Sequence, residues 1–391
     1  MPQISTARRA FLLLVVCSFF LCWQFVIPSA GNPSFVVPDH AVPGLLPGKN
    51  YPRAEAESEP FYHEQFANPG KHNKAHAASA SSATQGIVVY WYGGSDEGAS
   101  DVRILRATFN NAWSDPTPVM GIDQASNDLQ RYVRKVGNAV LVNPGDGVQW
   151  LFFVTVSAGG WAGSSISYVT STDNGISWSQ VKRLVTSPFL NLSTLVRTRA
   201  IFYDDGSIGL PVYHEFIGKF GELLRLDQHG RVLGKSRLHY GTESLQPAIA
   251  VNTPNHAIAL MRYSGAPRRN VLQTETSDAG ATWSKAEKNS LRNPNGAVEV
   301  LRLNDGRLLL ALNNSVMGRH DMSLAMSTNQ GQSWEIIKTI EQVDISPASH
   351  DIEFSYPTLT RDDNGMFHLL YSWNDKFIKH VRFNEAWLMQ P

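Results

Sequence analysis

Ser171-Thr172-Asp173-Asn174-Gly175-Ile176-Ser177-Trp178 is one of three nearly identical octapeptides in this chain. The other two begin at Thr276 and Ser327 and end at Trp283 and Trp334. In the shared pattern, Asp and Gly favour a tight turn, a small hydroxyl residue bonds the turn backbone, and Trp folds back over the turn as an apolar plug. Because such a turn joins two strands of a hairpin, its recurrence predicts recurring hairpins.

A second kind of turn recurs about every 50 to 60 residues, and a β-patterned run such as residues 87–92 follows it. The six examples lie at Gly86, Gly147, Gly206, His256, Gly306 and Gly365. A period of this length suits a four-stranded blade, so the chain is predicted to be an all-β, six-bladed β-propeller. A pair of β-sandwiches and a β-solenoid are the alternatives. Because a propeller closes on itself, residues 378–382 are expected to pair with the first blade.

Charge and composition narrow the possible partners. Lys and Arg total 34, as do Asp and Glu, so the chain has no net field to attract nucleic acid. Charged residues make up only 17% of the chain, which is typical of a turn-rich β protein. We predict a propeller over residues 76–391, preceded by a lead-in over residues 31–75 that is rich in Pro, Ala, Glu and His.

Residues 1–30 form a separate segment. Arg8 and Arg9 precede an apolar run over residues 10–26, and Pro28-Ser29-Ala30 follows with small residues suited to cleavage. This order is typical of a secretory signal peptide, so we predict export to the periplasm or the extracellular space. The run is slightly short of the roughly 20 residues that span a bilayer, and an uncleaved membrane tether through it is the alternative.

Both cysteines, Cys17 and Cys22, lie in this first segment. A mature chain that starts near Gly31 therefore has no disulfide, no thiolate metal site and no cysteine nucleophile. No acidic cluster has convincing spacing for calcium, so no metal or organic cofactor is predicted.

The octapeptides resemble the Asp-box (BNR) repeats of the sialidase superfamily, and the resemblance covers residues from about 76 to 383. The order of other segments is more specific, namely residues 97–102, 210–215, 246–247, 260–262, 293–295 and 354–357. This order is similar to that of the bacterial and plant BNR-repeat sialidase-like proteins. The repeats alone say little about activity, because propellers with other functions also carry them.

The resemblance implies a particular chemistry. A sialidase cleaves a ketoside whose reacting carbon bears a carboxylate, so a neutral tyrosine nucleophile avoids charge repulsion. In the family a neighbouring Glu activates this Tyr, an Asp is the acid/base, and three arginines bind the carboxylate. Arginine suits that task because its planar fork binds a carboxylate bidentately and stays charged.

Three positions of this chain match the family's pattern. The resemblance implies that Tyr356 is the nucleophile, that Arg262 is the second carboxylate-binding arginine and that Arg319 is the third. Each has a structural alternative: a buried aromatic residue for Tyr356, a link between blades for Arg262, and a solvated surface charge for Arg319.

Two positions depart from the pattern. The family's Glu lies sixteen residues before the second arginine, and Gln246 stands there. Gln cannot take a proton, so Tyr356 would need another base, for which Glu215 and Glu353 are available. Where the family has its first arginine, this chain has His76, a weaker and pH-dependent anion anchor or a general base. His76 as an ordinary hydrogen-bonded loop residue is the alternative.

The acid/base is expected in the loop after the strand that ends at Tyr92. Glu97 and Asp101 are both available there, and Glu97 is favoured because Asp101 lies closer to the next strand. His214 and Glu215 are adjacent in the sequence. We predict His214 as a substrate-binding residue and Glu215 as a catalytic residue, and a structural link at a strand end is the alternative for the pair. For Glu97, the alternative to a catalytic role is that it only caps a turn.

The sequence therefore predicts a monomeric, sialidase-like exo-glycoside hydrolase that acts on a terminal sialic acid or related acidic sugar of a glycoconjugate. The alternatives are a glycosidase or lyase acting on another acidic glycan, and a carbohydrate-binding propeller without catalysis.

Overall fold

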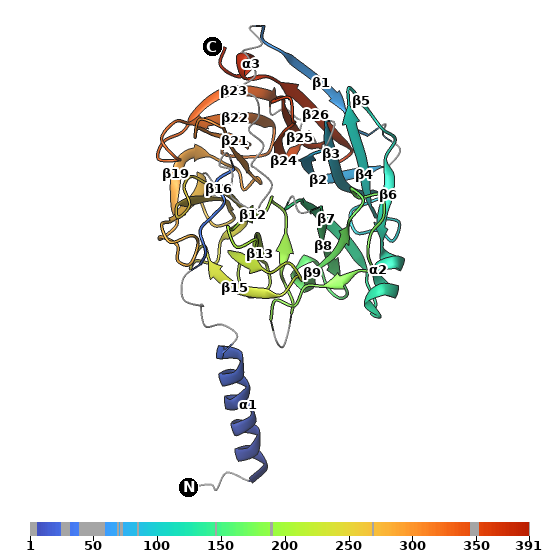
Figure 1. The fold of residues 1–391 in the computed structure, drawn as a ribbon, viewed down its shortest axis with the longest axis vertical. Helices are drawn as coiled ribbons and strands as arrows, with labels where there is room; N and C mark the ends of the chain where they lie inside the picture. The colour runs from blue at the N-terminus through green and yellow to red at the C-terminus, as the bar shows by residue number, and fades with distance from the viewer. Residues whose placement is uncertain are drawn as a thin grey trace.

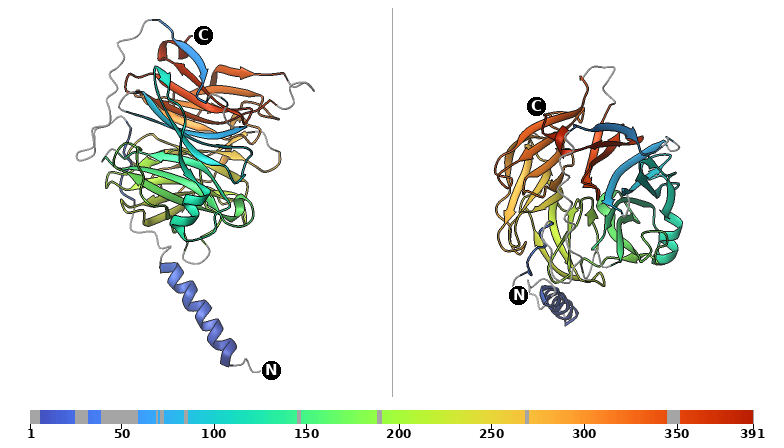
Figure 2. Two further views of the ribbon diagram at one scale, coloured as in Figure 1. Left: turned by 90° about the vertical axis from the view of Figure 1, so that its right-hand side faces the viewer. Right: turned by 45° about the horizontal axis from the view of Figure 1, so that its top comes forward.

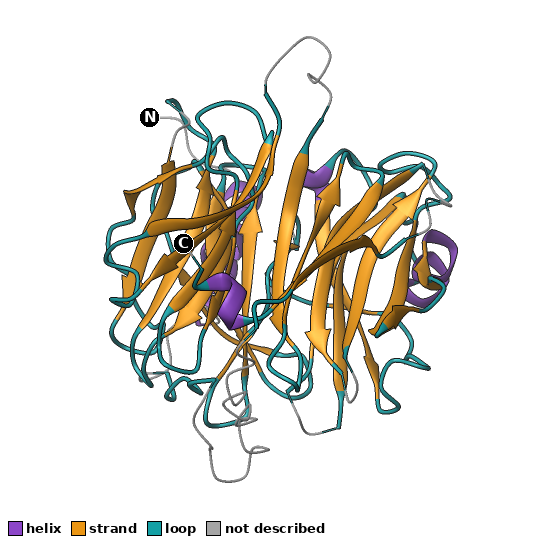
Figure 3. Cartoon of the chain, turned by 90° about the horizontal axis from the view of Figure 1, so that it is seen from above, coloured by secondary structure: helices purple, strands orange, loops and turns teal. Residues whose placement is uncertain are grey.

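The computed structural model describes residues 6–24, 32–38, 59–68, 70, 73–83, 86–144, 147–187, 191–267, 270–344 and 352–390. Six antiparallel sheets stand around a common axis (Figures 1 and 3), which confirms the predicted six-bladed β-propeller. The chain runs round the ring from blade to blade, and each blade starts with its innermost strand.

The first blade contains β2 (Lys74–Ser82), β3 (Ile87–Gly94), β4 (Arg103–Asn110), β5 (Ala112–Trp113) and β6 (Thr117–Gly121). The second blade contains β7 (Lys135–Val142), β8 (Gln149–Val156), β9 (Ser164–Ser171) and β10 (Lys182–Arg183). The third blade contains β11 (Leu195–Val196), β12 (Ile201–Phe202), β13 (Ile208–His214), β14 (Phe220–Leu226) and β15 (Val232–Arg237). In the third blade the innermost strand is interrupted, because β11 and β12 both pair with β13.

The fourth blade contains β16 (Ser244–Val251), β17 (Ala257–Tyr263), β18 (Asn270–Thr276) and β19 (Glu287–Arg292). The fifth blade contains β20 (Glu299–Arg302), β21 (Leu308–Leu312), β22 (Asp321–Ser327) and β23 (Glu335–Gln342). The sixth blade contains β24 (Phe354–Arg361), β25 (Phe367–Trp373), β26 (Phe377–Phe383) and β1 (Tyr62–Phe66). The helices are α1 (Thr6–Gln24), α2 (Ile122–Leu129), α3 (Glu385–Leu388) and the short 3-10 helix η1 (Trp161–Gly163).

The ring closes with a strand from outside the predicted propeller. β26 pairs with β1, which lies in the segment predicted as a lead-in, and not with the first blade. The lead-in contributes a second piece as well. Phe35 forms a β-bridge with Tyr203 and is almost fully buried. The ring is therefore held by two parts of the chain that precede residue 76.

Each octapeptide forms the predicted turn, between the third and fourth strands of its blade. The Ser171 hydroxyl accepts from the Gly175 amide at 2.9 Å, and the Asp173 carboxylate accepts from the Ser177 amide at the same distance. The equivalent bonds recur in the turns that begin at Thr276 and Ser327. The hydroxyl and Asp or Asn side chains thus satisfy the turn backbone.

The tryptophans of these turns contact the preceding blade. The Trp178 ring meets Tyr90 edge-on, Trp283 donates to Ser236, and Trp334 donates to Gln273. Apolar side chains fill the space between sheets, and strands such as β8 are buried along their whole length. The repeated turns therefore join neighbouring sheets as well as neighbouring strands.

Helix α1 lies outside the six sheets (Figure 2). Several of its apolar side chains are exposed, among them Phe11, Leu13 and Leu14. Among the described residues, no helix is long and apolar enough to span a membrane.

Candidate functional site

A backbone irregularity recurs at the start of the blades. Near the start of five blades, a non-glycine residue has left-handed backbone angles: Ala77 (φ 54°), Asn138 (φ 48°), Gln246 (φ 52°), Asn295 (φ 66°) and Tyr356 (φ 54°). In four of these blades the strand register also shifts at this residue, as in a β-bulge. A bulge turns a side chain out of the regular alternation, and strained backbone of this kind often marks a functional site.

Hydrogen bonds link these positions from blade to blade. The Tyr213 hydroxyl accepts from Asn138 at 3.1 Å and from the Gln246 amide at 3.3 Å. The Gln246 carbonyl oxygen in turn accepts from Arg262 at 3.1 Å. Gln246 is therefore held between a tyrosine and an arginine, and its side chain has no proton-accepting carboxylate to offer.

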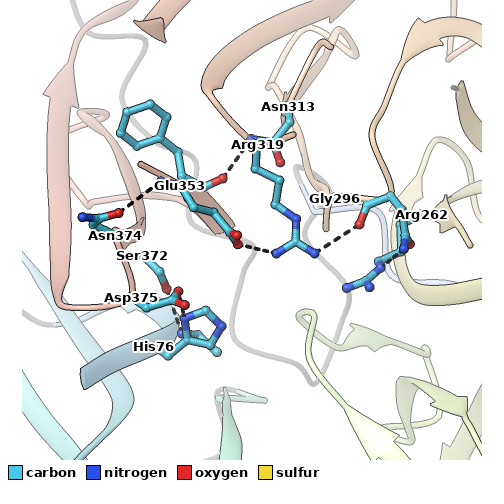
Figure 4. A network of polar contacts seen from close by, with 12 residues as sticks. His76, Arg262, Gly296, Asn313, Arg319, Glu353, Ser372, Asn374 and Asp375 are labelled. Atoms are coloured by element: carbon cyan, nitrogen blue, oxygen red, sulfur yellow. Dashed lines mark hydrogen bonds and ion pairs between the residues drawn. The ribbon is translucent and has the colours of Figure 1, made fainter. Parts of the chain in front are cut away.

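The chain of contacts continues through the fifth and sixth blades (Figure 4). Arg262 Nε donates to the Asn295 side chain at 2.8 Å, and Arg319 donates to the Asn295 carbonyl at 3.3 Å. Arg319 also forms an ion pair with Glu353 at 2.5 Å. Arg262 has no ion-pair partner among the described residues, so its charge is open to an anion.

Tyr356 lies beside three charged or titratable side chains, those of Arg197, Arg319 and His76. The Arg197 guanidinium carbon is 5.2 Å from the centre of the Tyr356 ring, and that of Arg319 is 5.8 Å away. The His76 ring meets Tyr356 edge-on, with 4.4 Å between ring centres. Within the described part of the chain, no hydrogen bond engages the Tyr356 hydroxyl, which leaves it available to a ligand.

His76 is paired with a carboxylate. Its Nδ1 lies 2.8 Å from Asp375 Oδ1, and neither atom has another polar partner among the described residues (Figure 4). Burial opposes ionisation of Asp375, yet the contact with His76 and the nearby positive charges lower its pKa overall. A charged Asp375 holds the Nδ1 proton of His76 and leaves Nε2 as the acceptor.

The two alternative bases are placed differently. Glu353 is occupied by Arg319. Glu215 lies in the field of Arg262, and burial raises the pKa of the Glu215 carboxyl despite that positive charge. Neither carboxylate contacts Tyr356 as directly as His76 does.

Glu97 lies at the edge of the cluster. Its carboxylate accepts from the Trp161 indole at 2.9 Å, and its charge acts on the buried Tyr92 hydroxyl. Trp161 packs over Gly137, next to the bulge residue Asn138, where an added Cβ would come within 2.8 Å of the indole. This contact explains why a glycine precedes the bulge in the second blade.

Two predicted residues, Asp101 and His214, have partners outside the network around Tyr356. Asp101 accepts from the amide and the hydroxyl of Ser95, and so closes the loop that carries Glu97. His214 contacts Glu222 at 2.7 Å and stacks on Phe220 within its own blade. Among the described residues, neither Asp101 nor His214 contacts Tyr356 or the arginines around it.

The sequence reasoning missed Arg197, Tyr213 and Asp375. The repeat does contain a signal for Arg197, because it lies nine residues before the turn at Gly206. Tyr356 and Asn138 lie nine residues before the corresponding turns of their own blades. Asp375, in a short turn between β25 and β26, has no such periodic signal.

No group of three His, Cys, Asp or Glu side chains in the described ranges is arranged to hold a metal ion. The groups gathered around Tyr356 are suited to binding an anion and to transferring a proton.

Comparison with known proteins places this geometry in context. The profile of a family described as BNR repeat-like domain matches residues 85–369. No curated protein sequence matches the chain. Among solved structures, the Hadza microbial sialidase Hz136 is similar, with 16% identity, a TM-score of 0.66, and coverage of 82% of this chain and 68% of the other.

Two further structures match over nearly their whole length. The intramolecular trans-sialidase from Ruminococcus gnavus, solved with oseltamivir carboxylate, has 13% identity and a TM-score of 0.64, covering 84% of this chain and 98% of its own. A protein of unknown function from Dyadobacter fermentans has 15% identity and a TM-score of 0.65, covering 83% and 99%. At these identities the likeness concerns the fold.

Proposed function

This chain belongs to the BNR repeat-like domain family, and we propose that it is a sialidase-like exo-glycoside hydrolase acting on a terminal sialic acid or related acidic sugar. One observation carries the proposal. Three guanidinium groups, those of Arg197, Arg262 and Arg319, belong to a single contact network around Tyr356, whose hydroxyl has no hydrogen-bond partner in the part of the chain that the structure describes. Such a cluster suits a substrate that carries a carboxylate next to the bond being cleaved.

Tyr356 is the proposed nucleophile. Its oxygen attacks the anomeric carbon while the bond to the leaving oxygen breaks, which gives a glycosyl-tyrosine intermediate that water then hydrolyses. The positive charges near its ring stabilise the negative charge that develops on the phenol oxygen.

His76 is the proposed base for this step, in place of the missing Glu. With Asp375 on Nδ1, its Nε2 is the nitrogen that receives the Tyr356 proton, and it returns that proton when the intermediate is hydrolysed. No hydrogen bond joins the two side chains in the free protein. Catalytic hydrogen bonds often tighten only when substrate is bound, so the ring contact at 4.4 Å supports the assignment.

Glu97 is the proposed acid/base for the leaving group. It protonates the departing oxygen in the first step and takes a proton from the attacking water in the second. Its place beside Trp161 and Tyr92, at the edge of the cluster, supports this role.

Turnover of a fluorogenic sialoside tests the proposal, together with a panel of uronic-acid glycosides. The Tyr356→Phe variant should lose turnover by about a thousandfold or more, since the nucleophile is absent. Tyr240→Phe, at an exposed position, is the matched control and should keep full activity. Hydrolysis by Tyr356→Phe at the rate of the control would reject the nucleophile.

A lyase acting on a uronic acid is the second candidate, because a His in contact with a Tyr beside arginines also suits proton abstraction next to a carboxylate. This reaction would leave an unsaturated sugar, which absorbs ultraviolet light, whereas hydrolysis leaves a saturated one. The absorbance of the products formed from uronic-acid substrates separates the two reactions.

We also propose that the protein is exported by its first 30 residues. The exposed apolar side chains of α1 support a signal segment, either cleaved or retained. The N-terminal sequence of the protein isolated from its host distinguishes the two, since cleavage would leave a chain that starts near Gly31.

A further inference from the structure

We infer that Arg197 binds the substrate's carboxylate and completes the anion site with Arg262 and Arg319. This rests on the proposed function and identifies the group that replaces the arginine missing at His76. Sequence resemblance does not supply this assignment, because Arg197 comes from the third blade and His76 from the first.

Arg197 is a buried cation that forms no ion pair with any residue in the described ranges. Only 4% of its surface is exposed, and its Nε has no hydrogen-bond partner among the described residues. The one hydrogen bond that it makes to the described part of the chain runs from Nη2 to the Pro357 carbonyl at 2.9 Å. A buried guanidinium that is paired so poorly is costly to the folded protein, which indicates that a ligand supplies the missing negative charge.

Glu299, the carboxylate whose charge acts on Arg197, does not neutralise it. Glu299 is 1% exposed and forms an ion pair with Arg199 at 2.8 Å. Burial raises the pKa of Glu299, although Arg199 and Arg197 oppose that shift. One carboxylate is therefore shared between two arginines, and the direct contact belongs to Arg199.

The surroundings of Arg197 place it at the reacting group. Its guanidinium faces the Tyr356 ring at 5.2 Å and acts electrostatically on the hydroxyls of Tyr213 and Tyr92 as well. The break between β11 and β12 lets the chain depart from the sheet at this point. Arg197 thereby occupies in its blade the position that the bulge residues occupy in theirs.

His76 is a poor anion anchor by comparison. When it is protonated, Asp375 at 2.8 Å cancels its charge, and the carboxylate repels a second anion. The same pairing suits His76 to proton transfer. The two functions predicted for His76 from the sequence are thus divided between two residues.

The test compares an acid with its ester. Oseltamivir carboxylate and its ethyl ester differ in the group that the arginines would bind, and calorimetry gives the dissociation constant of each. The wild-type protein should bind the acid more tightly than the ester. Arg197→Met should reduce the ratio of the two dissociation constants about tenfold or more, which corresponds to the loss of one charge-assisted hydrogen bond. Arg197→Lys should keep part of it.

Arg225→Met is the matched control, because Arg225 pairs with Asp205 on an outer turn and should leave the preference unchanged. Circular dichroism and thermal unfolding check that each variant folds, and Arg197→Met should not be destabilised by loss of an unpaired charge. No acid preference in the wild type, or the full preference in folded Arg197→Met, would overturn the assignment.

The outcome is separable from the proposed function. If sialosides are hydrolysed while Arg197→Met retains the acid preference, the function stands and the assignment fails. If the preference depends on Arg197 while no sugar is released from any substrate, the anion site stands and the hydrolase fails.

Discussion

Gln246 and Tyr356 both have left-handed backbone angles, which cost roughly 1–3 kcal/mol each for residues other than glycine. The folded ring bears this cost at the positions from which side chains meet near its axis. Conformations of this kind persist only where surrounding contacts determine them, and both positions lie at bulges in innermost strands.

Changing Gln246 to Glu tests how its neighbours work. A carboxylate there would pair with Arg262, whose partners among the described residues are the neutral side chains of Asn295 and Gln246, and would repel an anionic ligand. We expect Gln246→Glu to weaken binding of oseltamivir carboxylate about tenfold, with less effect on its ethyl ester, as measured by calorimetry. Equal or tighter binding of the acid would contradict this expectation.

At the scale of single residues, the sequence placed Tyr356, Arg262 and Arg319 in what proves to be one contact network. Their catalytic roles remain predictions. The resemblance could not identify Arg197 or Asp375, because both depend on contacts between blades that are far apart in the chain. Asp101, which the sequence ranked below Glu97 as the acid/base, closes its own loop through Ser95.

At the scale of elements, the three octapeptide turns connect their blades, the second, fourth and fifth, to the blade before each. Trp283 shows this, since it is 9% exposed, donates to Ser236 of the preceding blade and packs in a cluster with Phe35. The pattern predicted an apolar plug within the turn. It could not show which sheet the plug would meet, because that depends on the closure of the ring.

Removing the Trp283 side chain should therefore weaken the fold and spare the site. We expect Trp283→Ala to lower the free energy of unfolding by about 3 kcal/mol, because a large buried ring is lost. Ile176→Ala, at an exposed position of another octapeptide turn, should change it by less than about 0.5 kcal/mol. Urea denaturation measures both, and a similar loss in the two variants would contradict the role of the tryptophan.

The sixth blade contains a buried pair of histidines. His368 Nδ1 lies 2.8 Å from His380 Nε2, and His368 Nε2 lies 3.2 Å from Asp362. Burial lowers the pKa of both histidines, most strongly that of His380. At mildly acidic pH the unfolded chain therefore binds more protons at these histidines than the folded chain does. The free energy of unfolding falls as the pH drops below the histidine pKa of the unfolded chain, about 6.5.

Replacing His380 with Gln should make the protein less sensitive to acid. Between pH 7 and pH 5 the free energy of unfolding of the wild type should fall more steeply than that of His380→Gln, by up to about 1.4 kcal/mol per pH unit. His229→Gln, at an exposed position, should retain the wild-type slope. Denaturant titrations across this range would contradict the prediction if all three slopes agree.

At the scale of the whole molecule, the ring depends on a strand that the repeat count did not include. The octapeptides and turns predicted six blades correctly because each blade repeats its own turn chemistry. β1 lies outside every repeat, in a stretch without clear periodicity, so its pairing with β26 was not visible in the sequence. The segment from 62 to 66 joins the first and last parts of the fold.

Breaking β1 should open the ring. Gln65 lies opposite His380 in the closing pair. The Asn384 amide donates to the Phe61 carbonyl and the Ala67 amide to the Ile378 carbonyl, so Gln65 stands at a hydrogen-bonded position of the same alternation, and proline there removes a donor to β26. We expect Gln65→Pro to lower the free energy of unfolding by about 2 kcal/mol and to promote association through the uncovered edge of β26.

Glu64→Gln, one residue earlier in β1, is the control for that variant, because it keeps the backbone donors and removes only the charge that pairs with Lys379 at 3.0 Å. It should stay close to the wild type in thermal unfolding and in light scattering. If Gln65→Pro matches this control in both measurements, closure of the ring does not depend on β1.

The most direct test of the proposed chemistry is to trap the intermediate. A sialosyl fluoride with a second fluorine beside the anomeric carbon forms the glycosyl-enzyme but slows its hydrolysis, and mass spectrometry of the digested protein then locates the modified residue. We predict a single adduct on Tyr356. An adduct on Glu97, Glu215 or Glu353, or hydrolysis of a sialoside with inverted configuration and no adduct, would contradict it.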